Sequence, residues 1–166
     1  MDTPSTAQIS AHGSANPPRL VFLASLSIEV ATPIEVGPTL EGTRRVIPIQ
    51  GGTVSGPRLN GRILPGGADF QLLTSDTLTE LEAKYVIETT SGERIYVANF
   101  GLRTGTPEDI AALVRGEEVP PERIYFRCTP RLLSAGEEWG WLASRIILGV
   151  GTRLPTEVRL ELWIVE

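Results

Sequence analysis

Hydrophobic and polar residues alternate along most of the chain, whereas helical spacing of apolar residues is rare. The alternation is clearest from Leu20 to Val30, where every second residue from Phe22 onward is apolar, and from Glu157 to Val165. A period of two places successive side chains on opposite faces of a strand. The pattern therefore predicts a strand near each end of the chain, with Phe22 among the inward residues of the first.

Further strands are predicted between these two, separated by turns rich in glycine and proline. Gly51-Gly52 is expected to end one of them, Gly56-Pro57 to bend the next, and a turn is expected around Pro38 to Gly42. The predicted ranges are 44–49, 53–64, 68–75, 83–90, 93–100, 123–129 and 141–150.

The two runs 83–90 and 93–100 flank Ser91-Gly92, which is typical of a two-residue hairpin turn because glycine tolerates positive φ. That register pairs Tyr85 with Ala98 and Lys84 with Asn99. It predicts one face with Tyr85, Ile87, Tyr96 and Phe100, and another with Val86, Ile95, Val97 and Asn99. Both faces are apolar enough for a barrel wall or a subunit contact, and a slip of one residue would exchange Tyr85 for Lys84 inside.

One short helix is predicted as an insertion between strands. Thr106 can cap it, Pro107 suits its first turn, and Gly116 can stop it. About eight to ten strands with one helix predict an all-β fold, a closed antiparallel up-and-down β-barrel, with a two-sheet sandwich as the alternative. Eight strands enclose a space that side chains fill or that holds one small ligand. Residues 1–18 are expected to form a flexible tail and residues 19–166 the barrel domain.

Composition narrows the function. The net charge of −5 disfavours nucleic-acid binding. No apolar run approaches the roughly 20 residues that cross a bilayer, and the N-terminal segment lacks the features of a secretory signal, so a cytoplasmic location is expected. The only histidine, His12, lies in the tail, and Cys128 is the only cysteine. A histidine triad or a histidine or thiolate metal site is therefore not expected, and neither is a cofactor.

Catalysis without histidine depends on carboxylate, phenol, amide and guanidinium groups. Asp69 follows the tight turn Pro65-Gly66-Gly67, and if it points inward, burial can raise its pKa as a general acid or base requires. Tyr85, Asn99 and Arg103 complete the predicted catalytic set, as proton donor, carbonyl polariser and anion clamp. Each also has a structural interpretation as a turn, packing or salt-bridge residue. Predicted substrate-binding residues are Phe70, Gln71, Tyr125, Arg127 and Trp141.

Six motifs occur together in order: GGTVSGP, LPGGADFQ, AKYVI, IYVANFGLR, YFRCTP and WLASRIILGVGTR. The set resembles the small bacterial and fungal β-barrels known as the domain of unknown function three-two-three-seven, an uncharacterised protein family, over residues 19–166. The family pattern has G-G-A-D-W-Q, and Phe70 replaces its tryptophan here. The resemblance implies a barrel that self-associates as a dimer or larger homo-oligomer. The family's recurrent polar positions fall on Asp69, Gln71, Tyr85, Asn99, Arg103 and Arg127, with Trp141 nearby.

These observations favour a cofactor-independent enzyme, a lyase, isomerase or cyclase, acting on a small hydrophobic metabolite of phenolic or polyketide-like character inside the barrel. Two alternatives remain open. One is a carrier or sensor barrel that binds the same ligand without turnover. The other is a structural, self-associating module whose polar residues only stabilise the wall.

Overall fold

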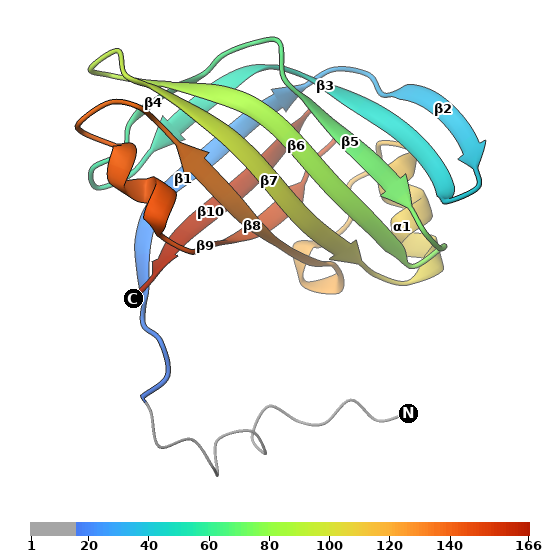
Figure 1. Cartoon of the computed structure of the whole chain (residues 1–166). Helices are drawn as coiled ribbons and strands as arrows, with labels where there is room; N and C mark the ends of the chain where they lie inside the picture. Colours follow the sequence, from blue (N-terminus) through green and yellow to red (C-terminus); the bar gives the residue numbers. More distant parts are fainter. Residues whose placement is uncertain (1–15) are drawn as a thin grey trace.

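The structure is a computed structural model that describes residues 16–166, and within that range ten strands form one antiparallel sheet rolled into a barrel (Figure 1). Residues 1–15 of the predicted tail, His12 among them, lie outside the described residues. The strands are β1 (Leu20–Val30), β2 (Ile34–Thr39), β3 (Gly42–Ser55), β4 (Gly61–Ile63), β5 (Ala68–Leu73), β6 (Leu78–Thr89), β7 (Arg94–Thr104), β8 (Tyr125–Leu133), β9 (Ile147–Arg153) and β10 (Glu157–Val165).

The sheet closes because β1 pairs with β10 on one side and with β3 on the other. Around the wall the order continues through β9, β8, β7 and β6, and both β4 and β5 bridge β6 to β3. The described chain is thus a closed eight-strand barrel with two extra strands and one short α-helix. This confirms the predicted closed antiparallel barrel and rules out the sandwich.

Strand β3 differs from the prediction, because it does not end at Gly51-Gly52. It runs through both glycines, pairing first with β2 and β5 and then with β1 and β4. Gly52 has a φ of 146°, and a Cβ there would lie 2.0 Å from the backbone oxygen of Ser27. Glycine therefore allows the strand to bend against β1 rather than stop. The predicted turn at residues 38–42 is confined to the tip between β2 and β3, since β2 reaches Thr39.

The predicted register of the β6–β7 hairpin is wrong by one residue. Tyr85 pairs with Val97 and Lys84 with Ala98. The loop has three residues: the Thr89 amide donates to the Glu93 carbonyl at 2.9 Å, and Gly92 takes a φ of 88°. A three-residue loop ending in a left-handed glycine is the next most common hairpin after the two-residue one. As a result Tyr85 and Asn99 share the inner face, whereas Tyr96 and Phe100 face outward.

Two further predictions are wrong for local reasons. The register of β1 against β10 shifts between Phe22 and Ala24, so Leu23 and Ala24 are buried and Phe22 is exposed. This β-bulge is invisible to simple alternation. The segment around Trp141 is a 3₁₀ turn, η3 (Gly140–Ser144), and the strand begins only at Ile147.

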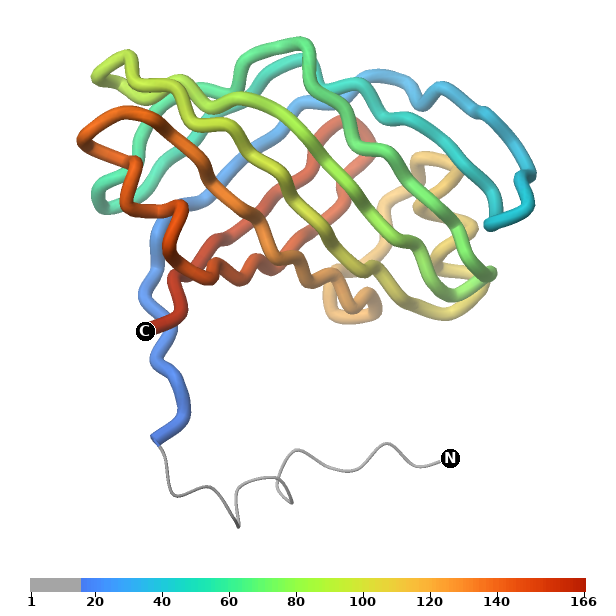
Figure 2. The backbone as a smooth tube through the Cα atoms, viewed as in Figure 1, coloured from blue at the N-terminus to red at the C-terminus, as the bar shows by residue number. Residues whose placement is uncertain are grey.

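The two ends of the barrel are covered differently (Figure 2). Helix α1 (Pro107–Val114) lies at one end, and the Thr106 side chain accepts a hydrogen bond from the Asp109 amide, as predicted. Asp109 is buried and forms an ion pair with Arg123 of the short turn η2 (Pro121–Arg123). At the opposite end η3 lies against the barrel mouth, and Trp139 and Leu142 join the apolar core.

Candidate functional site

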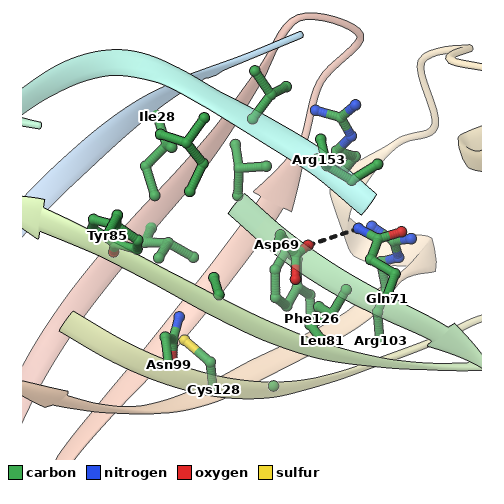
Figure 3. Close-up of a pocket in the computed structure, with 17 residues that line it drawn as sticks. Ile28, Asp69, Gln71, Leu81, Tyr85, Asn99, Arg103, Phe126, Cys128 and Arg153 are labelled. Carbon is green, nitrogen blue, oxygen red and sulfur yellow. Dashed lines mark hydrogen bonds between the residues drawn. The ribbon is translucent and has the colours of Figure 1, made fainter. Parts of the chain in front are cut away.

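An internal cavity occupies the half of the barrel nearer α1 (Figure 3). Its free space is about 40 Å³, enough for on the order of a few water molecules, whereas pockets for drug-sized ligands measure roughly 300–1,000 Å³. A metabolite of more than a few heavy atoms therefore requires side chains at one end to move. The lining residues are Ile28, Val30, Ile47, Ile49, Asp69, Gln71, Leu81, Ala83, Tyr85, Asn99, Gly101, Arg103, Phe126, Cys128, Arg153, Val158 and Leu160.

Strand parity explains why these side chains converge. Asp69 and Gln71 are two residues apart on β5, as are Asn99, Gly101 and Arg103 on β7, so each set shares the inner face. The pairing places Asp69 opposite Ala83, and Ala83 opposite Asn99. The small Ala83 side chain leaves open space between the carboxyl group and the amide.

Asp69 lies in the middle of the polar part of the cavity. The Gln71 Nε2 donates a hydrogen bond of 2.7 Å to Oδ2 (Figure 3), while Oδ1 is buried and has no partner among residues 16–166. Burial raises the pKa of Asp69, since desolvation disfavours its charged form more than Gln71, Arg103 and Arg153 favour it. A carboxyl with a raised pKa exchanges protons closer to neutral pH, which suits a general acid or base.

Arginines surround this carboxyl on the side towards α1. Arg103 is 2% exposed, and its Nε has no partner in the described range of the chain. Burial lowers the pKa of Arg103 to about 10, so it remains a cation at neutral pH. Arg153 from β9 also lines the cavity, and burial lowers its pKa as well. Arg45 from β3 is close enough for its charge to lower the pKa of both.

Tyr85 and Asn99 lie on the other side of Asp69 from Gln71 and Arg103, and Asn99 is beside Cys128 (Figure 3). The Tyr85 hydroxyl and the Asn99 Oδ1 are buried without hydrogen-bond partners in the described part of the chain. Burial raises the pKa of Tyr85 above its ordinary value and that of the Cys128 thiol to about 11. Both groups are therefore protonated at neutral pH, so Tyr85 can donate a hydrogen bond and Cys128 is a poor nucleophile.

Glycines on β9 shape the opposite wall. A Cβ at Gly149 would lie 2.5 Å from the Cys128 Sγ, and one at Gly151 would lie 2.5 Å from the Phe126 ring. These side chains from β8 therefore point inward only because the neighbouring strand lacks side chains at those positions. Phe126 and Cys128 form an apolar part of the cavity wall next to the polar groups.

Four predicted substrate-binding residues do not line the cavity. Phe70, Tyr125 and Arg127 are exposed on the outer wall, because each is next to an inward residue and strand side chains alternate. Tyr125 and Arg127 stack on each other there, with 4.9 Å between the guanidinium carbon and the ring centroid. Trp141 stacks on Trp139 at the η3 end. Of the predicted set, the structure brings together Asp69, Gln71, Tyr85, Asn99 and Arg103.

The sequence prediction missed Arg153 and Arg45. Parity carried the signal for both: Arg153 follows Ile147, Gly149 and Gly151 on one face of β9, and Arg45 precedes Ile47 on β3. Arg153 went unrecognised because the predicted strand ended at Val150. Arg45 is one of two adjacent arginines at the start of the predicted strand 44–49, where arginine side chains are ordinarily exposed.

Within residues 16–166 no group of three or more His, Cys, Asp or Glu side chains could hold a metal ion. Nor does any helix in this range have the length and apolarity to span a membrane. The candidate site consists of protein groups that exchange protons or bind anions.

The fold and cavity define a closed β-barrel with a polar cluster buried inside an otherwise apolar interior. The chain belongs to the family described as protein of unknown function DUF3237, whose model matches residues 18–165.

Relatives and solved structures agree with this assignment. The UPF0311 protein RPA1785 of Rhodopseudomonas palustris is 38% identical over 84% of this chain and 92% of its own length. The crystal structure of that protein covers 92% of this chain and 99% of its own with a TM-score of 0.86 at 36% identity. A β-barrel-like protein from Acinetobacter baumannii covers 93% of this chain and 100% of its own, with a TM-score of 0.81 at 34% identity.

A more distant likeness shows the fold alone. The crystal structure described as an enzyme from Penicillium herquei covers 93% of this chain and 99% of its own, with a TM-score of 0.69 at 19% identity. The barrel architecture is thus shared with a fungal enzyme structure.

Proposed function

We propose that this protein is a cofactor-independent enzyme, a lyase, isomerase or cyclase, that acts on a small, largely hydrophobic metabolite by moving protons in the barrel interior. The observation that carries the proposal is Asp69, a carboxyl group with a raised pKa and an unpartnered Oδ1 facing an internal cavity. A buried carboxyl with one oxygen left unpartnered costs folding free energy. Its retention in an otherwise apolar barrel is explained if it does chemical work there.

The neighbouring groups supply what such a reaction needs. As a carboxylate, Asp69 would take a proton from the carbon beside a substrate carbonyl, which becomes an enolate. The Tyr85 hydroxyl and the Asn99 side-chain N–H belong to residues that line the cavity and would donate hydrogen bonds to that oxygen, while the Arg103 cation on the α1 side of the cavity would favour the negative charge of the enolate. Returning the proton from Asp69 to another carbon completes an isomerisation, and departure of a β-substituent with the electron pair completes an elimination. Attack of the enolate carbon on a second carbonyl of the same molecule, whose oxygen then takes the proton from Asp69, completes a cyclisation.

The shared architecture with the Penicillium herquei enzyme supports the proposal only by showing that this kind of barrel can host an enzyme. The competing function is a carrier that binds the same ligand without turnover. The small free volume and the unpartnered polar atoms are compatible with either, so the two differ only in whether bonds to hydrogen are broken.

Proton transfer can be tested directly in deuterated buffer. Small ketones, 1,3-dicarbonyl compounds and keto acids are incubated with the protein, and deuterium incorporation at carbon is followed by mass spectrometry. We expect incorporation into at least one compound, lost in Asp69→Asn and retained in Asp76→Asn, a matched change in an exposed turn. Saturable binding without incorporation would establish the carrier, and equal incorporation by Asp69→Asn would overturn the role of Asp69.

A further inference from the structure

Three arginines gather at the α1 end of the barrel, one each from β3, β7 and β9. Arg103 and Arg153 line the cavity, and Arg45 adjoins them from the surface side. Their charges act on one another: Arg153 and Arg45 lower the pKa of Arg103, and Arg45 lowers that of Arg153. We call Arg45, Arg103 and Arg153 the arginine cluster.

The arginine cluster has more positive charge than the described protein balances. Arg45 pairs with Glu35 at 3.0 Å, but neither Arg103 nor Arg153 forms an ion pair within residues 16–166. Asp69 is the one carboxylate that lines the cavity, and its charge is itself disfavoured by burial. Buried charges in proteins are ordinarily paired, because an unpaired one loses its hydration without compensation.

The same end of the barrel also has a surface groove next to the cavity. A surface groove of about 480 Å³ lies between the C-terminal part of α1, the residues after β1 and the turn between β9 and β10. Val30 and Arg153 line both this groove and the internal cavity. Arg153 therefore stands at the boundary between surface and interior.

Arg153 is held there weakly. Its guanidinium donates to the backbone oxygens of Glu157 and Pro155, each at 3.4 Å, which is long for a hydrogen bond. A ligand oxyanion offers a shorter, charge-assisted partner, so its arrival would favour a rotation of Arg153 that widens the narrow cavity.

We propose that the arginine cluster is the substrate entrance and an anion-binding subsite, and that the substrate is a small organic carboxylate. Its carboxylate would lie between Arg103 and Arg153, and its apolar body would extend towards Ile47, Leu81 and Leu160. A planar carboxylate matches the forked donors of guanidinium groups, and two arginines from different strands fix its direction. The inference rests on the proposed function, because it places the reacting carbon next to Asp69.

The test compares ligands that differ in charge but hardly in shape. Benzoate and benzamide form one pair, butyrate and butyramide a smaller one, and binding is measured by calorimetry on the full chain. We expect each carboxylate to bind about 10- to 100-fold more tightly than its amide, the range set by charge-assisted hydrogen bonds. Higher salt should reduce the preference, since ions screen the attraction.

Variants locate the effect. Arg103→Gln and Arg153→Gln should each remove most of the carboxylate preference, whereas Arg127→Gln on the outer wall should leave it unchanged. If Arg103→Gln does not fold, as judged by its thermal unfolding, Arg103→Lys keeps the charge and should retain part of the preference. Equal affinity for carboxylates and amides, no saturable binding of any probe, or a preference that survives both glutamine variants would overturn the inference.

The outcomes separate this inference from the proposed function. Asp69→Asn should keep the carboxylate preference while losing deuterium exchange. Carboxylate-selective binding without deuterium exchange by any form of the protein would overturn the proposed enzyme and support the anion-binding subsite. Deuterium exchange into neutral ketones without any preference for carboxylates would support the proposed enzyme and overturn the anion-binding subsite.

Discussion

At the η3 end of the barrel, Leu59, Trp139 and Leu142 are at most 2% exposed and join a continuous apolar core. Towards α1 the interior instead holds a carboxyl, an amide, a phenol and arginines around a cavity. Of the eight buried side-chain polar atoms without partners in residues 16–166, seven lie on strands from this polar region and one belongs to Trp139. The comparison teaches that the apolar η3 end stabilises the fold. The end towards α1 lowers the stability, because it buries charges and polar atoms without partners, and those groups are available to a ligand.

Asp69→Asn should produce the largest change in activity. Removing a general acid or base reduces a rate by about 10²- to 10⁴-fold, so deuterium exchange or turnover should fall by that factor. The folded protein should become more stable at neutral pH, because the amide avoids burying a charge. Rates and chemical denaturation are measured on the same preparations, with Asp76→Asn as control.

The pH dependence checks the cause of that stability gain. Below the ordinary aspartate pKa of 3.8 the Asp69 carboxyl is protonated in both the folded and the unfolded chain, so there is no free-energy cost of burying its charge. Above it the unfolded chain ionises first, and stability falls until the pH passes the raised folded pKa. The gain of Asp69→Asn over the wild type should therefore be absent at low pH and grow above that window. A gain independent of pH would contradict a raised pKa.

Leu142→Ala should show the opposite profile, a large loss of stability with little effect on the chemistry. Leu142 is 1% exposed at the η3 end, and a buried leucine truncated to alanine costs about 2–5 kcal/mol of unfolding free energy. The free energy of unfolding is measured in denaturant, and the rate is measured where the variant is fully folded. A rate loss as large as that of Asp69→Asn would show that the two ends are not separable.

Tyr85→Phe should have an intermediate effect. The Tyr85 hydroxyl has no partner in the described structure, so deleting it should not destabilise the free protein and can recover part of a desolvation cost of about 1–3 kcal/mol. If the hydroxyl donates to the substrate, turnover should fall by about 10-fold or more, as expected for loss of a hydrogen bond of roughly 1.5 kcal/mol. Tyr125→Phe on the outer wall is the matched control. Destabilisation by Tyr85→Phe without loss of rate would identify a structural hydroxyl.

Alternation along strands was enough to predict the strands of the barrel and to place Gln71 on the same strand face as Asp69. Such predictions depend only on a parity that a single strand preserves. The relation between strands was not predictable in the same way, because it depends on the loop. One extra loop residue, Thr90, moved Tyr85 to the face of Asn99, and the sequence Ser91-Gly92 suits both loop lengths.

Phe70 and Tyr125 were predicted to bind substrate but face outward. Both were selected as aromatic residues near polar ones, although parity with Asp69 and Phe126 required the opposite face. The residue types in a motif are thus a weaker guide to which side chains face the cavity than the alternation of the strand that carries them. Of the arginine cluster, Arg103 was predicted as the anion clamp but Arg45 and Arg153 were not, because the three residues lie on strands that only closure of the barrel brings together.

The smallest predicted effect concerns the cover at the α1 end. Thr106→Ala removes the side-chain oxygen that accepts from the Asp109 amide, which costs about 1 kcal/mol in a typical helix cap. Because α1 is an insertion at the barrel end rather than part of the wall, we expect the loss to appear as faster hydrogen exchange in α1 residues 107–114 with little change in the β-sheet. If ligands pass beside α1, carboxylate binding should become faster at nearly unchanged affinity, because a looser cover lowers the barrier in both directions. Unchanged association kinetics despite faster exchange in α1 would place the route into the barrel elsewhere and leave the helix a purely structural cap.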